Sequence, residues 1–220
     1  MNSAKEFEEK RKRIVEFMKD TEAVKTKEVE NAFLKIKREI FVPLDLQAVA
    51  YADEALPIGF GQTISQPSTI AVMLELLEAK KGMKVLEVGA GSGYVCALLS
   101  EIVEEKGEIF GIELVSELFE RAKENLKLQG CKNIELVVGD GSIGWKEKSP
   151  FDRILVSAAC PCIPDALFEQ LKEKGIIVAP VGDRFTQTMQ KIKKIKGKQE
   201  KEEYEKTCFV FVPLKGEQGF

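Results

Sequence analysis

Between residues 84 and 180, short apolar runs alternate with stretches of helical spacing, and no other feature of the sequence limits the possible folds as strongly. Five runs are apolar enough to form buried strands, at 84–88, 108–113, 134–138, 151–157 and 175–180. Three stretches between them have the apolar spacing of helices, at 94–103, 116–128 and 165–172. We therefore expect an α/β fold with a doubly wound, mainly parallel sheet, right-handed crossovers and helices on both faces.

The residues before this alternation predict helices and one long loop. Apolar side chains recur at helical spacing from Phe7 to Ile40 on a charged background, which indicates two amphipathic helices. These helices should end before Pro43, because proline disfavours the helical conformation of the residue that precedes it. An irregular stretch rich in Gly, Pro and Asp then runs to Pro67, where a further helix begins and continues to near Gly82.

The C-terminal residues predict two antiparallel strands at the edge of the sheet. Residues 207–212 are β-branched and aromatic, and a turn around 196–198 would close a hairpin. The hairpin brings the sheet to seven strands. We expect a single domain with an N-terminal extension at 1–66, an α/β core at 67–182 and the hairpin at 183–220.

The 220 residues include no histidine, and this absence excludes several kinds of chemistry. Ser-His-Asp and Cys-His catalysis, histidine-ligated zinc and an imidazole general base all require that side chain. Five cysteines lack the paired spacing of a zinc or redox site, at positions 96, 131, 160, 162 and 208. We expect these cysteines to be small buried apolar residues, and we expect no metal.

Charge and hydropathy limit the partners and the location. Lys and Arg number 33 against 36 Asp and Glu, for a net charge of −3, which does not favour nucleic acid as a partner. No apolar run approaches the ~18 residues of a membrane helix. The charged start, from Lys5 to Arg11, does not have the pattern of a signal peptide. These features predict a cytoplasmic protein that does not span a membrane.

The strongest local motif is a strand that runs into three glycines and then into a helix. Gly89, Gly91 and Gly93 follow the apolar run 84–88 directly. Glycines at such a turn allow a ligand to approach the backbone closely. Their spacing is G-x-G-x-G, whereas the dinucleotide fingerprint G-x-G-x-x-G would need a glycine in place of Tyr94. The motif therefore indicates a nucleotide-like ligand other than a nicotinamide cofactor, with a tight turn that binds nothing as the alternative.

Two acidic residues follow the next two strands. Glu113 ends the second strand, twenty residues beyond Gly93, where a carboxylate can accept hydrogen bonds from ribose hydroxyls. Asp140 and Gly141 follow the third strand. Because the carboxyl ends of parallel strands meet at one edge of a sheet, all three motifs should border a single crevice.

These motifs together resemble those of class I S-adenosylmethionine-dependent methyltransferases. Further segments make the resemblance more specific, and the sequence is similar to the protein-L-isoaspartate O-methyltransferases over nearly its whole length. The segment before the glycines, 56–67, carries the most characteristic part of the match. The other matching segments, in the order of the family, are 38–43, 51–53, 139–145, 150–154, 180–182 and 211–214.

The resemblance implies methyl transfer from S-adenosylmethionine to the α-carboxyl group of L-isoaspartyl residues in damaged proteins. S-adenosylhomocysteine is then the product, and the methyl ester closes to a succinimide that leads to repair. By position, Ser65 matches the catalytic serine of the family. For the oligomeric state, a monomer is favoured. The implied cofactor-binding residues are Thr63, Ile64, Glu87, Gly89, Gly91, Gly93, Glu113, Asp140 and Gly141. The implied substrate-binding residues are Ile58, Ser65, Ala158 and Val181.

This chemistry agrees with the absence of histidine. A carboxylate with a reference pKa of ~3.9 is already ionised at neutral pH and needs no general base. We expect Ser65 to donate a hydrogen bond that orients this carboxylate or the cofactor. The alternative is that Ser65 only caps the helix that begins near Pro67.

Some features depart from the family or leave the activity open. The segment 157–164 has cysteines where the family usually has acidic or polar residues. The loops 51–60 and 180–184 are candidates for the peptide groove or are ordinary connections, and Arg184 is a candidate partner for a carboxylate. Three other functions stay open: a class I methyltransferase acting on a small molecule or RNA, a nucleotide-binding module without catalysis, and an NAD-dependent oxidoreductase.

Overall fold

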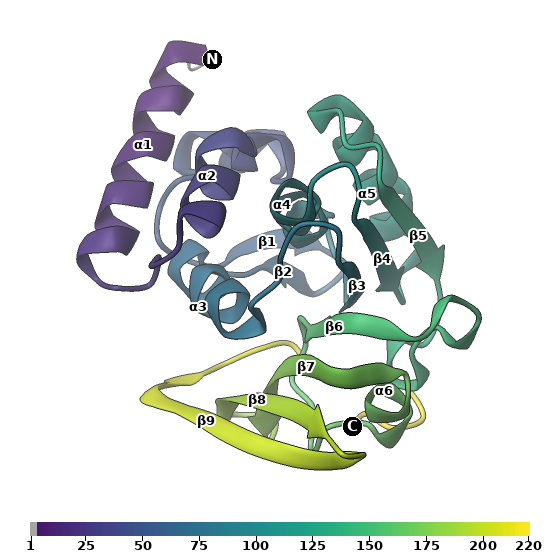
Figure 1. Cartoon of the computed structure of the whole chain (residues 1–220). Coiled ribbons are helices and arrows are strands. Elements are labelled where there is room, and N and C mark those ends of the chain that lie inside the picture. Colours follow the sequence, from purple (N-terminus) through teal and green to yellow (C-terminus); the bar gives the residue numbers. More distant parts are fainter. Residues whose placement is uncertain (1–3) are drawn as a thin grey trace.

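The computed structural model describes residues 4–220, except for the side chains of 205–207, so the first three residues of the predicted N-terminal extension lie outside it. A seven-stranded sheet forms the centre, with the strand order β5-β4-β3-β6-β7-β8-β9 (Figure 1). Its first five strands in this order run parallel to one another. Strand β8 pairs antiparallel with both of its neighbours, β7 and β9. The bounds are β3 Lys84–Val88, β4 Glu108–Glu113, β5 Ile134–Val138, β6 Phe151–Val156, β7 Leu171–Gly182, β8 Gln187–Ile195 and β9 Lys198–Phe209. The predicted fold class is confirmed.

Helices cover one face of the sheet more fully than the other. Strand residues alternate between two apolar clusters, as the two-residue period of a strand requires. Val85 and Leu155 join the cluster that includes side chains of α3, α4 and α5. Leu86 and Ile154 join the second cluster, which includes Leu167 of α6 and packs against Trp145. The bounds are α3 Pro67–Leu77, α4 Tyr94–Val103, α5 Ser116–Gln129 and α6 Asp165–Glu169.

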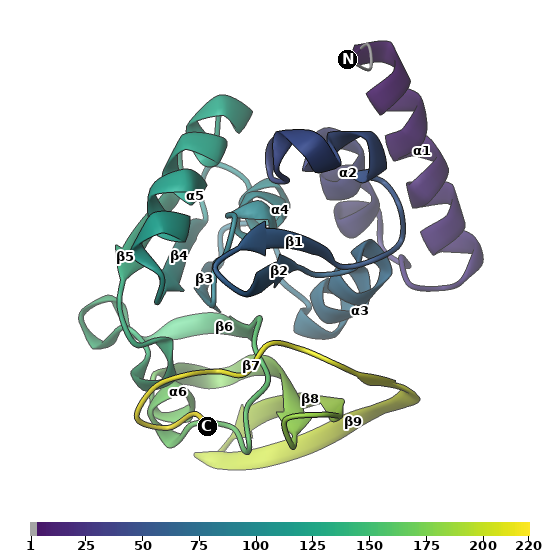
Figure 2. The same cartoon turned by 180° about the vertical axis from the view of Figure 1, so that it is seen from behind.

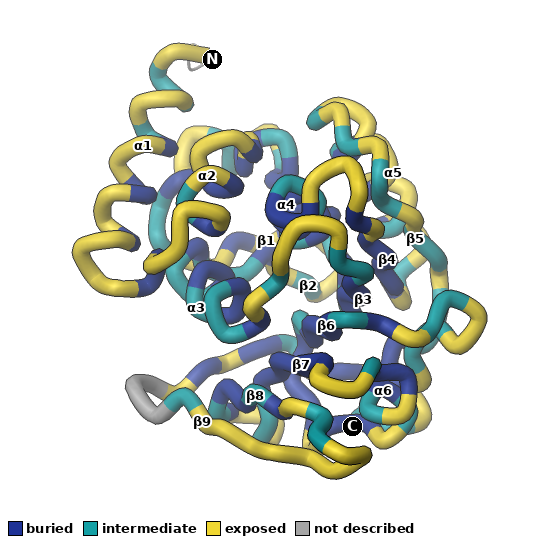
Figure 3. Tube along the Cα trace, in the orientation of Figure 1, coloured by how far each residue is buried: buried dark blue, intermediate teal, exposed yellow. Residues whose placement is uncertain are grey.

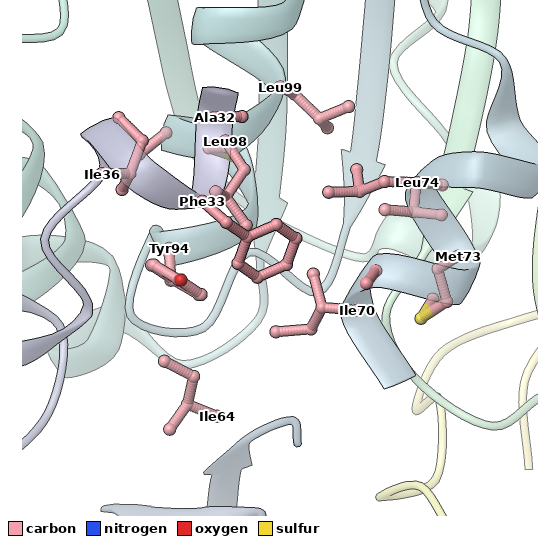
Figure 4. Close-up of a cluster of buried hydrophobic side chains, with 14 of the residues drawn as sticks. Ala32, Phe33, Ile36, Ile64, Ile70, Met73, Leu74, Tyr94, Leu98 and Leu99 are labelled. Atoms are coloured by element: carbon pink, nitrogen blue, oxygen red, sulfur yellow. The ribbon is translucent and has the colours of Figure 1, made fainter. Parts of the chain in front are cut away.

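The two predicted N-terminal helices, α1 (Ala4–Asp20) and α2 (Lys27–Lys35), lie beside α3 and α4 (Figures 1 and 2). Phe33 of α2 points toward Tyr94 of α4, with the ring centroids 6.4 Å apart, and Ile70 of α3 lies close by (Figure 4). Two short 3-10 helices, Arg38–Ile40 and Leu44–Val49, follow α2. The N-terminal extension thereby shares the apolar cluster of the core.

The long loop expected between Phe41 and Pro67 holds a small hairpin that the sequence pattern did not predict. Strands β1 (Leu56–Gly59) and β2 (Gln62–Ile64) pair antiparallel. Their turn contains Gly59, Phe60 and Gly61, all with positive φ. Strands of four and three residues are too short to give a periodic signal. The hairpin approaches the glycine turn, because a Cβ on Gly91 would lie 3.4 Å from Ile58 Cδ1.

The position of the last strand was predicted wrongly, although a turn at Lys196-Gly197 joins the hairpin as expected. Strand β9 begins nine residues before the expected 207 and ends at Phe209. The start of β9 is charged and exposed (Figure 3), and charge is typical of a sheet edge. Lys191 of β8 lies opposite Glu202 in the register and forms an ion pair with it at 3.5 Å. Apolar composition therefore could not locate this strand.

Two further predictions need correction. Helix α6 ends at Glu169 instead of Lys172, because Leu171 already pairs with Phe151 in the sheet. Cys162 and Cys208 are exposed, whereas only Cys96 and Cys160 are fully buried as expected and Cys131 is half-buried. Cys162 lies in a loop and Cys208 near the end of the edge strand, and neither belongs to an apolar cluster of the described residues.

Candidate active site

The glycine turn joins β3 to α4 and has a backbone that side chains would strain. Gly89, Gly91 and Gly93 have φ values of 85°, 56° and 86°. Such values are in the left-handed region, which only glycine adopts at no steric cost. A Cβ on Gly93 would also lie 3.2 Å from Leu126 Cγ of α5. The spacing of the glycines is thus explained by the turn itself.

The carboxylate of Glu113 fixes this turn. It lies at the end of β4, is only 6% exposed, and accepts a hydrogen bond from the Gly91 amide at 2.6 Å. Its other oxygen accepts from the Val115 amide at 2.9 Å. Each carboxylate oxygen accepts more than one hydrogen bond, so capacity remains for a hydroxyl of a ligand. The sequence predicted the ribose contact but not this internal role.

A cavity of 120 Å³ lies against the glycine turn and gathers six of the predicted residues. We call it the glycine-loop cavity. Its walls include Thr63, Gly89, Gly91, Glu113, Gly141 and Ala158. These residues come from β2, the ends of β3, β4 and β6, and the turn after β5. The carboxyl ends of neighbouring parallel strands therefore meet as expected for an open α/β sheet.

A second, larger cavity of 510 Å³ lies beside the first, and we call it the serine cavity. Its walls include Ser65, Val72 of α3, Phe17 of α1 and Phe211 after β9. Three residues, Thr63, Ser157 and Val212, line both cavities. The two cavities thus meet at a junction that is walled by two hydroxyl groups and one apolar side chain.

Ser65 is half-buried in the wall of the serine cavity, and its hydroxyl forms no hydrogen bond with any described residue. Its backbone is held instead, because Arg38 Nη1 donates to the Ser65 carbonyl at 3.0 Å. The cap interpretation is wrong, since Gln66 is the N-cap of α3. Asp53 serves the first turn of α3 by accepting from the Ser68 amide at 2.9 Å. The hydroxyl of Ser65 is thus available to a ligand.

The comparisons with known proteins agree with this geometry. A family model described as protein-L-isoaspartate(D-aspartate) O-methyltransferase matches residues 9–219. The chain belongs to this family. Relatives named protein-L-isoaspartate O-methyltransferase in Dictyoglomus turgidum and Petrotoga mobilis are 47% and 48% identical to it. These matches cover 99% and 98% of the chain, and 96% and 100% of the relatives.

Solved structures show the same family resemblance. A protein-L-isoaspartate O-methyltransferase superimposes with a TM-score of 0.84 at 32% identity, over 95% of this chain and 67% of its own. A Plasmodium falciparum candidate for the same enzyme, solved in complex with S-adenosyl-L-homocysteine, gives a TM-score of 0.81 at 25% identity. That match covers 92% of this chain and 97% of the other. The resemblance inferred from the motifs is confirmed.

Asp140 occupies a different place from its neighbour in this methyltransferase. Gly141 lies in the wall of the glycine-loop cavity, whereas Asp140 is not among the residues that line it. The Asp140 carboxylate accepts from the Ser142 amide at 2.8 Å and from the Glu217 amide of the C-terminal segment at 2.8 Å. Burial alone would raise the pKa of Asp140, but its hydrogen bonds with Ser142 and Glu217 hold it below its usual value. An adenine contact through Asp140 stays a prediction.

Of the other predicted residues, one lies beside the glycine turn and the rest lie outside both cavity walls. Ile58 is buried and approaches Gly91. Ile64, Glu87 and Val181 line neither cavity. The guanidinium of Arg184 lies over the Phe220 ring at 5.4 Å, outside both cavity walls.

Two functional features were missed by the sequence argument. Ser157 was noted only as the start of an unusual segment, and Val212 only as part of a matching one, yet both line the junction. A strand end next to the glycine strand was the available signal for Ser157, because β6 pairs with β3. For Val212 no local signal existed, because a tertiary hydrogen bond holds it at the site. The Ala159 amide donates this bond to the Val212 carbonyl at 2.8 Å.

The described residues hold neither a membrane-spanning helix nor a metal-binding cluster. None of their helices is both long and apolar enough to cross a membrane. Cys, Asp and Glu side chains form no group of three or more that could hold a metal ion within the described part of the chain.

Proposed function

We propose that this protein transfers the methyl group of S-adenosylmethionine to the α-carboxyl group of L-isoaspartyl residues in damaged proteins. The observation that carries the proposal is the junction of the two cavities, with the glycine turn on one side and Ser65 on the other. Two reactants held in adjoining cavities meet at such a junction. Membership of the protein-L-isoaspartate O-methyltransferase family supports the choice of both reactants.

The walls of the glycine-loop cavity suit a ligand that carries hydroxyl groups. Glu113 supplies acceptors for ribose hydroxyls, while the glycine turn lets the ligand lie against the backbone. The cavity alone is smaller than the ~300 Å³ of a usual small-molecule site, but it continues at the junction into the serine cavity.

The reaction needs no proton transfer from the protein before the methyl group moves. S-adenosylmethionine, when bound, supplies an electrophilic methyl group on a sulfonium, and the substrate supplies an ionised carboxylate. Opposite charges are lost on the way to the transition state, so exclusion of water from the junction favours the reaction. Ser65 donates a hydrogen bond that aligns the carboxylate. Alignment of two reactants alone supplies up to ~7–11 kcal/mol.

The first experiment is methyl transfer with purified protein and radiolabelled S-adenosylmethionine. Two synthetic peptides should be offered that differ only in an L-isoaspartyl or a normal aspartyl linkage. We expect a base-labile methyl ester on the isoaspartyl peptide alone. Binding of the cofactor without transfer to either peptide would overturn the proposal. Transfer to a small molecule or RNA instead would favour the alternative methyltransferase function.

Replacing Ser65 with alanine should reduce kcat/KM for the isoaspartyl peptide by about 10- to 100-fold, since a hydrogen bond to a charged group is worth ~1.5–3 kcal/mol. The midpoint of thermal unfolding should move by less than about 2 °C, because the hydroxyl forms no internal hydrogen bond with the described residues. Ser65→Thr, which keeps a hydroxyl, is the control. Equal losses of stability and activity in Ser65→Ala would assign Ser65 a structural role instead.

Several further expectations from the sequence belong to this proposal. They are a single domain, a monomeric state, a cytoplasmic location and the absence of a nucleic-acid partner. The near balance of charge, 33 basic against 36 acidic residues, supports the last of them. All four stay predictions.

A further inference from the structure

Ser157 lies at the junction of the two cavities but has no role in the proposed mechanism so far. It follows β6 directly, is half-buried, and lines both cavities. Its amide donates to the Val88 carbonyl at 2.8 Å, which fixes its backbone beside the glycine strand. A Cβ on Gly89 would lie 3.8 Å from the Ser157 Cβ, so the two residues face each other across the start of the glycine turn.

The Ser157 hydroxyl is joined to a buried carboxyl group. Its Oγ lies 2.9 Å from Glu87 Oε1 on β3, and Glu87 is only 1% exposed. The second oxygen, Oε2, has no hydrogen-bond partner among the described residues. An ionised carboxylate is costly to bury with so few donors around it. This environment therefore favours the protonated, uncharged form of Glu87.

The groups that face Glu87 support the same conclusion. They are the thiol and the backbone amide of Cys96 on α4, the Ser157 hydroxyl after β6 and the Glu113 carboxylate of β4. None of these is a cation. The pKa of Glu87 is raised to about 8, chiefly by burial and to a smaller extent by the negative charge of Glu113, although hydrogen bonds with Cys96 and Ser157 act in the opposite direction.

The Ser157 hydroxyl can point in two directions, and a proton on Glu87 Oε1 selects one of them. When the proton of the uncharged carboxyl group lies on Oε1, the atom next to Ser157, its O–H donates to Ser157 Oγ, which leaves the serine O–H free to donate into the junction. An ionised carboxylate only accepts, so the serine O–H must then turn toward Glu87. In that state Ser157 presents lone pairs to the junction, and these would repel a substrate carboxylate.

We infer that Ser157 is a second hydroxyl donor to the substrate carboxylate, placed at the junction with Ser65, and that Glu87 is the positioning residue that turns the Ser157 hydroxyl toward the substrate. This inference rests on the proposed function, because it assigns the carboxylate as the group that is bound. A carboxylate has two oxygens, and two donors hold it in one orientation better than one does. One oxygen then faces the methyl group.

The first test compares Ser157→Ala with Ser157→Thr in the full-length protein. We expect Ser157→Ala to lower kcat/KM for an isoaspartyl peptide by roughly tenfold or more, while the Kd for S-adenosylhomocysteine, measured by calorimetry, changes less than twofold. Ser157→Thr restores the hydroxyl and should recover most of the activity. A Ser157→Ala enzyme within twofold of wild type would overturn the inference, and so would a loss confined to cofactor binding.

The second test uses pH, and its readout would not respond to a purely structural role. As pH rises through about 8, Glu87 loses its proton and Ser157 loses its free donor, so kcat/KM for the peptide should fall on the alkaline side. The side chain of Glu87→Gln does not titrate, so this alkaline fall should disappear in the variant whatever the level of activity. An unchanged alkaline fall in Glu87→Gln would overturn the role of Glu87.

The two proposals fail in different ways. If the wild-type protein does not methylate the isoaspartyl peptide, both the proposed function and this inference are overturned. If the wild-type protein methylates the peptide and Ser157→Ala is equally active, only this inference is overturned.

Discussion

Replacing Arg38 with alanine should lower the free energy of unfolding by about 3–5 kcal/mol, measured by denaturant titration. Arg38 is 1% exposed and donates to three carbonyl groups, those of Ala50 at 2.7 Å, Ser65 at 3.0 Å and Glu54 at 3.3 Å. Each buried carbonyl left without a donor costs about 1–3 kcal/mol. The guanidinium also lies over the Tyr94 ring at 5.3 Å, and this contact would be lost.

The same substitution should reduce activity under conditions in which the variant is still folded. The three carbonyl groups belong to the segment that leads into β1 and to the residue that carries the proposed catalytic hydroxyl. Arg38 joins the carbonyl groups of Ala50, Glu54 and Ser65. Without this side chain, we expect Ser65 to be displaced. Methyl transfer at low temperature, where the variant stays folded, is the measurement.

Two further variants make the Arg38 prediction specific. Arg13→Ala, at an exposed position of α1, should change the free energy of unfolding by less than about 0.5 kcal/mol. Arg38→Lys keeps the charge but not the planar fork of donors, so it should be intermediate. A loss in Arg38→Ala as small as that in Arg13→Ala would show that the three hydrogen bonds do not hold the segment.

The parts of the fold that were predicted correctly are those with a strong local signal. Strands 84–88, 108–113 and 134–138 agree with the structure to the residue, because their mostly apolar runs are bounded by glycine or polar residues. Strand β9 was misplaced because its stability comes from pairing with β8, and its charged side chains face solvent. The β1–β2 hairpin was missed because its position depends on tertiary contacts such as that between Ile58 and Gly91.

In the site too, the residues that could be predicted are those with a local signal in the sequence. Glycines that need positive φ and an acid at a strand end are visible in sequence, since one residue type at one position meets a local backbone requirement. The position of Ser65 came from resemblance to the family, and the structure adds its surroundings. Arg38 and Ser157 act through partners 27 and 70 residues away, Ser65 and Glu87. Sequence spacing alone does not reveal such pairs.

Replacing Glu113 with alanine should weaken binding of S-adenosylhomocysteine by about 100-fold or more, measured by calorimetry. The proposed contact with the ribose hydroxyls would be lost, at ~1.5–3 kcal/mol for each hydrogen bond to a charged group. In addition, the Gly91 and Val115 amides would lose their acceptor. The glycine turn would then no longer be held in the conformation that the cofactor needs.

The internal and the ligand-binding roles of Glu113 can be separated. Loss of the two internal hydrogen bonds should lower the free energy of unfolding in the absence of any ligand, by about 2 kcal/mol. Glu117→Ala, at an exposed position of α5, should alter neither quantity. If Glu113→Ala destabilises the protein but binds S-adenosylhomocysteine normally, the carboxylate only supports the turn, and the ribose hydroxyls must have another partner. If both quantities fall together, one carboxylate shapes the turn and binds the cofactor, which explains its burial beside three glycines.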